Sequence, residues 1–158
     1  MEKNKTISVW LTIISGRNKG KIILQKRSSA NKTFPYICQA TWAGKVKIGE
    51  DVESAIKREC VEELGESFFN AFNFLVLKIF SEDKFIMNGA EWTCYNYVGD
   101  ISNKILKLIR LHSEALPEFI LIDSDSEIFP VKSEKNSKNN IVLFDDQYKV
   151  LKEIINGN

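Results

Sequence analysis

Residues Gly44 to Glu66 read G-K-V-K-I-G-E-D-V-E-S-A-I-K-R-E-C-V-E-E-L-G-E and contain the clearest helical pattern of the chain. Apolar residues recur at helical spacing from Val52 to Leu64, and Asp51 stands where an N-terminal cap belongs. Gly65 follows the last apolar position, where helices commonly end on glycine. The pattern predicts a helix over about residues 51–64, entered from a loop that contains glycine.

Acidic side chains occupy the face of this helix that should be apolar. At about 100° per residue, Glu59 and Glu63 point along the apolar stripe, and Glu62 flanks it. A run of acids on a helix is usually a solvated surface with pairs at i,i+4, but ionised carboxylates on a core-facing stripe are costly unless a cation compensates them. Arg58 alone cannot neutralise all three carboxylates. A divalent metal can, and oxygen ligands on adjacent turns suit Mg²⁺ or Mn²⁺ better than zinc.

The loop before the helix supplies the second half of a site. Mg²⁺ held by a few carboxylates is commonly completed by phosphate oxygens of a substrate. Residues 43–50 include Gly44 and Gly49, which let the backbone approach a ligand closely, and they end on Glu50. The loop, the acidic helix and the glycine stop together predict one compact metal and phosphate site.

These residues carry a resemblance to the Nudix family, whose signature is G-x5-E-x7-R-E-U-x-E-E-x-G-U, where U is a bulky apolar residue. All seven fixed positions are in register, and such a match at one start position arises by chance about once in 10⁸. Cys60 is smaller than the usual residue at the first U position, Glu66 replaces the last U, and Lys47 stands where many members have a further Glu. The matched positions are Gly44, Glu50, Arg58, Glu59, Glu62, Glu63 and Gly65.

The resemblance implies a fold, a reaction and a set of roles. It implies an α/β/α sandwich around a central mixed β-sheet, with residues 1–158 forming a single domain. The implied reaction is hydrolysis of a diphosphate linkage, in a nucleoside diphosphate linked to another moiety X or in a related organic diphosphate, by attack of water on phosphorus. Glu59, Glu62, Glu63 and the Gly44 carbonyl are the implied ligands of Mg²⁺ or Mn²⁺. Arg58 and Glu50 are implied to form an ion pair that orients these ligands.

A general base is also expected, and in many members of the family it is a Glu from a loop after the signature. The loop H-S-E-A-L-P-E at residues 112–118 makes Glu114 the candidate and Glu118 the runner-up. Glu114 can equally be an ordinary exposed loop acid. His112, the only His of the chain, is a further alternative.

Candidates for substrate contact lie outside the signature. Arg27 and Lys45 are candidates to contact substrate phosphates, although cations on strands and loops are more often simply exposed. Aromatic residues offer a stacking surface for a base, although aromatic residues in strands more often belong to the core. These are Phe34, Tyr36, Trp42, Trp92, Tyr95 and Tyr97.

Two alternative functions remain open. Residues 25–29 and 32–35 are similar to the isopentenyl-diphosphate isomerase branch of the family, which uses a Cys in the segment leading into the signature. Ala43 stands at that position, and this favours hydrolysis. A Nudix domain can also be a ligand-binding or sensor module without turnover. Such modules generally lose signature glutamates, so the retained Glu59, Glu62 and Glu63 favour an enzyme.

Composition narrows the partners and the location. The 158 residues carry 22 Lys and Arg against 21 Asp and Glu, a net charge of +1, which removes the electrostatic argument for a nucleic-acid polymer or a membrane surface as partner. The expected partner is a small-molecule diphosphate, and a homodimer stays open. Apolar runs fall far short of the roughly 20 residues of a membrane helix, and the first residues lack the pattern of a secretory signal, so the cytoplasm is the expected location. Three widely spaced cysteines, Cys38, Cys60 and Cys94, predict reduced thiols.

The remaining elements follow from shorter patterns. Alternating apolar residues, or short stretches rich in β-branched and aromatic residues, predict strands at residues 7–13, 21–26, 74–80 and 92–98. Asp145 or Asp146 starts a second amphipathic helix, which ends before Gly157. Residues 132–140 predict a flexible loop, and residues 105–111 fit a strand or a helical turn equally well.

Overall fold

The computed structural model describes residues 1–133 and 138–157. Its described strands form one mixed sheet in the order β5-β6-β1-β2-β3-β9-β8, with β4 paired to β1 and β7 paired to β2. The strands are β1 (Lys3–Ile13), β2 (Ile22–Lys26), β3 (Cys38–Gln39), β4 (Trp42–Lys45), β5 (Lys78–Met87), β6 (Ala90–Ile101), β7 (Ile120–Ile122), β8 (Ile128–Pro130) and β9 (Ile141–Leu143). The helices are α1 (Val52–Leu64), α2 (Glu66–Ala71), α3 (Asn103–Leu106) and α4 (Asp145–Asn156), with 3-10 turns η1 (Phe74–Val76) and η2 (Val131–Ser133).

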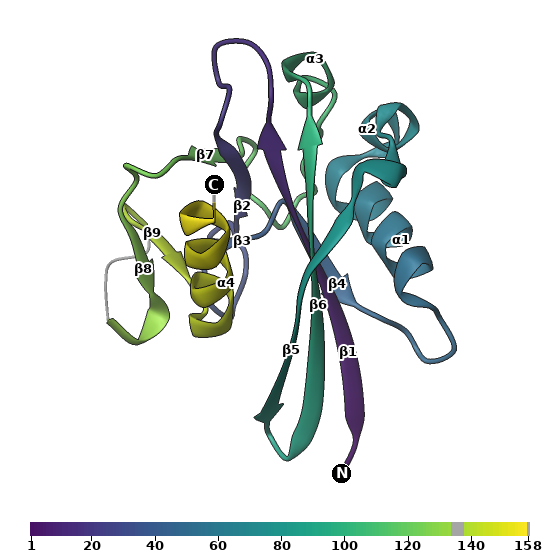
Figure 1. Ribbon diagram of the computed structural model, residues 1–158. Coiled ribbons are helices and arrows are strands. Elements are labelled where there is room, and N and C mark those ends of the chain that lie inside the picture. The colour runs from purple at the N-terminus through teal and green to yellow at the C-terminus, as the bar shows by residue number, and fades with distance from the viewer. Residues whose placement is uncertain (134–137, 158) are drawn as a thin grey trace.

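The alternation of side chains along β1 explains the layers. Ile7, Val9 and Leu11 are fully buried in a cluster that includes residues of α1 and α2. Trp10 points to the opposite face and packs in a second cluster with Leu151 of α4. A strand whose two faces are both buried needs a helix layer on each side. Figure 1 shows α1 and α2 on one side of the long strands and α4 on the other, which confirms the α/β/α sandwich with a mixed sheet.

Helix α1 has the predicted ends. The Asp51 side chain accepts a hydrogen bond from the Ser54 amide at 2.7 Å and caps the first turn. Gly65 has φ of 91°, a conformation that favours glycine, and its N–H donates to the Val61 carbonyl. The prediction of a helix over residues 51–64 is confirmed. The chain then enters a second short helix, α2, whose first turn contains Glu66, so the departure from the signature at Glu66 places an exposed acid at a helix start.

Trp42 fixes α1 against the sheet next to the predicted site. Its side chain is fully buried, and its indole Nε1 donates to the Ile56 carbonyl of α1 at 2.9 Å. The rings of Phe68, Phe72 and Phe74 surround it edge to face at 5.8 to 6.4 Å. The two residues that follow Trp42 in β4 are therefore held beside the acidic face of α1.

Two predicted segments need correction or completion. The predicted strand at residues 74–80 is wrong in its first half, because Phe74–Val76 forms a 3-10 turn and β5 begins at Lys78. The Asn73 side chain accepts from the Leu75 amide at 3.1 Å and stabilises that turn. Residues 105–111 fitted a strand or a helical turn equally well. In the structure, helix α3 ends at Leu106 and so includes only the start of this stretch. The predicted loop at 132–140 includes residues 134–137, which lie outside the described residues.

The other predicted elements match. Strands β1, β2 and β6 contain the predicted strands at 7–13, 21–26 and 92–98 apart from Lys21, and α4 starts at Asp145 and ends before Gly157. Within the described residues, no helix is long and apolar enough to cross a membrane.

Candidate active site

Gly44 and Glu59 lie in direct contact at the centre of the site. A Cβ atom added to Gly44 would overlap the Glu59 carboxyl group and lie 2.6 Å from its Cγ. Glycine is therefore required at this position of β4 for the Glu59 side chain to lie against the backbone. The Glu59 side chain is only 12% exposed, as expected for a carboxylate on the inner face of α1.

Arg58 ties the loop before α1 to the acids of the helix. Its Nε and Nη2 donate to the two carboxylate oxygens of Glu50 at 2.8 and 2.9 Å, a bidentate pair. Its Nη1 donates to Glu59 at 2.7 Å, and Nη2 also donates to the Lys45 carbonyl at 2.9 Å. The hydrogen bonds from Arg58 lower the pKa of Glu50 to about 2. The structure therefore places Arg58 and Glu50 together, as predicted.

Glu63 is the most deeply enclosed acid of the site. Its Oε1 accepts from Gln25 Nε2 at 2.6 Å and from the Ala43 amide at 3.3 Å. Burial, followed by the hydrogen bond with the neighbouring Glu59 carboxyl, raises the pKa of Glu63 to about 8, against the lowering effect of the bond from Gln25. The raised pKa keeps a proton on Glu63 at neutral pH, because burial and the adjacent Glu59 carboxylate both disfavour a second negative charge there.

Gln25 and His112 belong to the site, although the sequence analysis assigned Gln25 no role in it. Gln25 is buried in β2, and its Oε1 lies 2.8 Å from His112 Nε2. A continuous chain of polar contacts therefore runs from His112 through Gln25 and Glu63 to Glu59. Burial lowers the pKa of His112, which favours the neutral imidazole. The signal for its role was that a polar residue directly follows the apolar run Ile22-Ile23-Leu24 of a strand.

Glu62 lies apart from the other two glutamates. Its side chain is 55% exposed, and its carboxylate lies 3.5 Å from Arg58 Nη1. Within the described residues, no group of three or more His, Cys, Asp or Glu side chains meets the distances of a metal site. The structure thus joins Glu59 and Glu63 and leaves Glu62 at the rim. The donors still fit a hard cation, since they are carboxylate oxygens and the buried pair lacks a full counter-charge.

Comparison with known proteins gives the family. The NUDIX domain profile matches residues 5–119, which is most of the chain and includes every residue of the site described so far. This chain belongs to the Nudix family. A search of curated proteins finds no match.

Solved structures share the Nudix fold at low sequence identity. A MutT/nudix family protein from Enterococcus faecalis is 16% identical with a TM-score of 0.66, and the match covers 96% of this chain and 61% of that one. A NUDIX hydrolase from Alicyclobacillus acidocaldarius is 12% identical with a TM-score of 0.63, over 99% and 92% of the two chains. The C-terminal domain of mouse MUTYH, solved in complex with human PCNA, is 10% identical with a TM-score of 0.59, over 98% and 88%. At these identities the likeness shows the fold alone.

The two candidate bases of the Nudix domain lie in the loop before β7. Glu114 is exposed, and its carbonyl accepts from the Ser28 amide at 2.9 Å and from Asn31 Nδ2 at 2.7 Å. These bonds fix the backbone of the loop beside β2 and leave the carboxylate in solvent. The charge of Glu114 acts on the imidazole of His112, opposing the effect of burial on its pKa. Glu118 is exposed further along the loop.

The two candidate phosphate contacts differ in their surroundings. Arg27 Nη2 donates to Asn31 Oδ1 at 3.0 Å and to the Thr33 carbonyl at 3.1 Å, so its guanidinium is engaged by the loop after β2. Its Nε is buried and has no hydrogen-bond partner among the described residues. Lys45 lies at the cavity beside Gly44, with Nζ 5.5 Å from the centre of the Trp92 ring.

A cavity of about 590 Å³ opens beside Gly44, between the long strands and the start of α4. Phe85 and Trp92 stack with their planes 7° apart, and Phe34 meets Phe144 edge to face at 4.9 Å. Of the candidate stacking residues, Phe34 and Trp92 line this cavity, whereas Trp42 belongs to the core. The sequence did not point to Phe85 and Phe144, because they join the cavity only through the fold.

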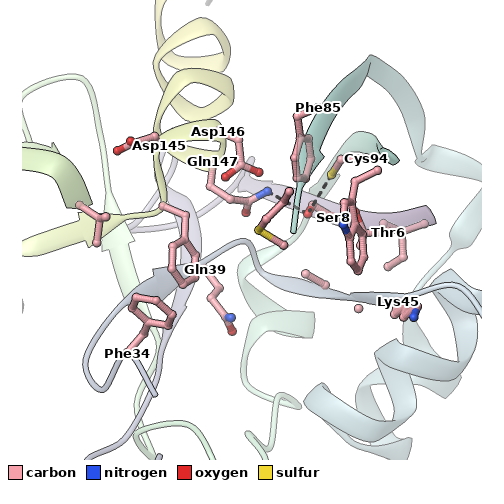
Figure 2. Close-up of a pocket in the computed structure, with 17 residues that line it drawn as sticks. Thr6, Ser8, Phe34, Gln39, Lys45, Phe85, Cys94, Asp145, Asp146 and Gln147 are labelled. Atoms are coloured by element: carbon pink, nitrogen blue, oxygen red, sulfur yellow. Dashed lines mark hydrogen bonds between the residues drawn. The ribbon is translucent and has the colours of Figure 1, made fainter. Parts of the chain in front are cut away.

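Polar groups at the start of α4 line the same cavity. Gln147 Nε2 donates to Ser8 Oγ at 3.1 Å. Figure 2 shows Gln147 and Asp146 directed toward the side of Ser8 and Phe85, whereas Asp145 points the other way. Burial raises the pKa of Asp146. The cavity thus combines aromatic faces with a few hydrogen-bonding groups, the usual make-up of a small-molecule site.

Proposed function

We propose that this Nudix protein hydrolyses a diphosphate linkage in a nucleoside diphosphate linked to another moiety, or in a related organic diphosphate, by attack of water on phosphorus. The observation that carries the proposal is the buried pair Glu59 and Glu63, which lies against Gly44 at the edge of the 590 Å³ cavity. A carboxyl pair of this kind is costly to maintain for stability alone. Its position beside a cavity favours a catalytic purpose.

Glu59, Glu62, Glu63 and the Gly44 carbonyl are the residues that would hold Mg²⁺ or Mn²⁺. When bound, such an ion offsets charge on phosphoryl oxygens and lowers the pKa of a coordinated water. The exposed Glu62 has the freedom to turn toward the pair, since its contact with Arg58 is long at 3.5 Å. Arg58 and Glu50 keep Glu59 oriented through their bidentate bond.

The neighbouring residues divide the remaining tasks. Gln25 holds the Glu63 carboxyl in place, and His112 holds Gln25. The aromatic cavity takes the moiety attached to the diphosphate, with Lys45 at its edge for a phosphate oxygen. Arg27 is a weaker candidate for phosphate because Asn31 and Thr33 already engage it. Glu114 is the proposed general base, acting on water from the loop beside His112.

Isomerase chemistry finds little support in the site. Ala43 occupies the position where that branch carries its Cys, and its amide donates to Glu63. Cys38 is completely buried, and burial raises its pKa to about 11. A thiol with a raised pKa is a poor nucleophile or acid at neutral pH.

The experiment that tests the proposal combines a substrate panel with labelled water. Nucleoside triphosphates, sugar nucleotides, dinucleoside polyphosphates and prenyl diphosphates are incubated with the protein and Mg²⁺ in ¹⁸O-water. We expect cleavage of at least one member, with the label in a phosphate product. Label in the organic product would overturn attack on phosphorus, and rearrangement without incorporation would support the isomerase. Binding without turnover across the panel would indicate a sensor module.

A further inference from the structure

Strand β5 is an edge strand with an unusually apolar surface. It lies at one end of the sheet order, and within the described residues it pairs only with β6. Four of its apolar side chains are exposed: Ile79 by 55%, Phe80 by 37%, Ile86 by 68% and Met87 by 47%. Long edge strands with exposed apolar residues are ready to pair with another strand. In Figure 1, β5 and β6 extend past the helices in one long arm together with the start of β1.

The charges on β5 are arranged so that the strand complements itself. Glu82, Lys84 and Ile86 are exposed on one face, whereas Ser81, Asp83 and Phe85 are half-buried on the other. Two copies of β5 in antiparallel pairing, related by a twofold axis at Asp83, bring Glu82 of each copy opposite Lys84 of the other. Opposite charges in directly paired positions stabilise adjacent strands.

We propose that the protein forms a homodimer by antiparallel pairing of the β5 edges of two copies, in the register centred on Asp83. The same register brings the exposed Ile86 of each copy toward the exposed Phe80 of the other, so an apolar contact flanks each ion pair. The sheet becomes continuous across the twofold axis. Because each chain uses its one β5 edge, the contact is isologous and closes at two copies.

Neighbouring registers are less favourable. A twofold axis normal to the sheet keeps each side chain on its own face of the sheet, so the axis must pass through a residue. The nearest alternative registers are therefore centred on the residue before or after Asp83. Centring on Glu82 or on Lys84 brings two like charges together at the axis, which destabilises the pair. Centring on Asp83 also brings two acids near, but each Asp83 carboxylate accepts from Ser81 Oγ at 2.9 Å and Asn96 Nδ2 at 3.1 Å in its own chain. These bonds direct the charge toward β6.

The bulge in β5 limits how far the pairing extends. The register between β5 and β6 shifts between Ile79 and Ser81, and bulges of this kind twist an edge away from further pairing. The regular pairing is therefore confined to Ser81 to Phe85, and Phe80 of one copy meets Ile86 of the other at its margin. On the face of the aromatic cavity, Ser81 of the second copy comes beside Phe85, so the dimer would add to the wall that Phe85 provides.

Charge reversal tests the dimer directly. Sedimentation velocity over a dilution series in the micromolar range is expected to show a monomer and dimer equilibrium for the wild type. Glu82→Lys and Lys84→Glu each convert both ion pairs into like-charge contacts, and each is expected to raise the dimer dissociation constant at least about tenfold. The double variant Glu82→Lys/Lys84→Glu restores opposite charges and is expected to dimerise like the wild type.

The matched control is Glu127→Lys, an equal charge change at an exposed residue next to β8, at the other end of the sheet order. It is expected to leave the dissociation constant unchanged. Circular dichroism confirms folding of each variant, and amide hydrogen exchange of residues 81–86 in the wild type gives a readout that needs no variant. We expect that exchange to slow as protein concentration rises. A wild type that stays monomeric, exchange independent of concentration, or a double variant no better than the single ones would overturn the proposal.

Discussion

At the scale of single residues, the site depends on contacts that join distant parts of the sequence. Gly44 and Glu59 were predicted together because both belong to one short signature with fixed spacing. Gln25 was not predicted, because its contact with Glu63 spans 38 positions and with His112 spans 87. A single sequence shows that the residue is Gln but does not show which distant residue it contacts. The placement of Glu62 at the rim likewise depends on a side-chain orientation that helical spacing alone leaves undetermined.

Replacing Gly44 tests the close approach of the Glu59 side chain. In Gly44→Ala the new methyl group occupies the space of the Glu59 carboxyl, which is the free end of a flexible side chain and can move. We expect the fold to persist while metal affinity and hydrolysis rate fall about 10- to 100-fold. Titration calorimetry and steady-state rates measure the two effects.

Gly49→Ala is the matched control. No atom of the described part of the chain lies within 4 Å of an added Cβ there, but φ is 81°. The backbone strain is expected to lower stability and to leave the rate unchanged. Equal rates for Gly44→Ala and the wild type would show that Glu59 need not contact residue 44.

The pKa of Glu63 predicts a pH dependence of stability in the metal-free protein. Burial raises that pKa from 4.5 to about 8, so over this range the folded protein keeps a proton that the unfolded chain has released. The free energy of unfolding therefore falls as pH rises from about 4.5 to about 8. Glu63→Gln removes this titration and is expected to be more stable than the wild type at the upper end of the range. Urea unfolding in EDTA at a series of pH values measures the free energy of unfolding of both proteins. Curves of this free energy against pH that are parallel for the two proteins would contradict the prediction.

Glu114→Gln tests the proposed general base. Loss of a base slows proton removal from the attacking water, so we expect kcat to fall about 10²- to 10⁴-fold with little change in apparent metal affinity. Glu118→Gln, at an exposed position of the same loop, is the control and is expected to keep its rate. If both variants retain wild-type rates across a pH series, the base lies among the signature glutamates, and Glu62 is the next residue to replace.

At the scale of elements, prediction succeeded where a pattern was long and had distinct ends. Helix α1 has both an apolar stripe and recognisable ends at Asp51 and Gly65, and β1 alternates over its whole length. Strands of two to four residues such as β3 and β4 are too short to show a period, and they exist because β1 and β2 pair with them. Helix α2 was missed because six residues with two adjacent Phe have no recognisable helical stripe.

Phe68 tests the attachment of α2 to the site. Its side chain is fully buried, stacked on Phe72 at 5.4 Å and edge to face with Trp42. We expect Phe68→Ala to lower the free energy of unfolding by about 3–5 kcal/mol, measured by urea unfolding. Phe69→Ala, at a half-buried position of the same helix, is expected to cost less. A loss for Phe68→Ala below about 1 kcal/mol would show that the aromatic cluster does not fix α2.

At the scale of the whole molecule, the fold gathers the cavity from parts that are separate in the sequence. Phe34, Phe85, Trp92 and Phe144 line one cavity only because the fold brings β5, β6, the segment after β2 and the start of α4 together around it. The family signature predicted the sandwich. The cavity depends on packing between elements whose order in the sheet no local sequence pattern predicts.

The role of the carboxyl pair in holding a catalytic metal is tested by the rate of phosphate release from the best substrate as a function of free Mg²⁺, for the wild type and Glu59→Gln. The wild type is expected to be inactive in EDTA, to regain its rate on addition of Mg²⁺ or Mn²⁺, and to saturate. Glu59→Gln is expected to need far more metal and to reach a much lower rate, because it lacks the carboxylate held against Gly44. Turnover that is insensitive to EDTA, or equal in the two proteins, would contradict metal-dependent hydrolysis at the Glu59 carboxylate.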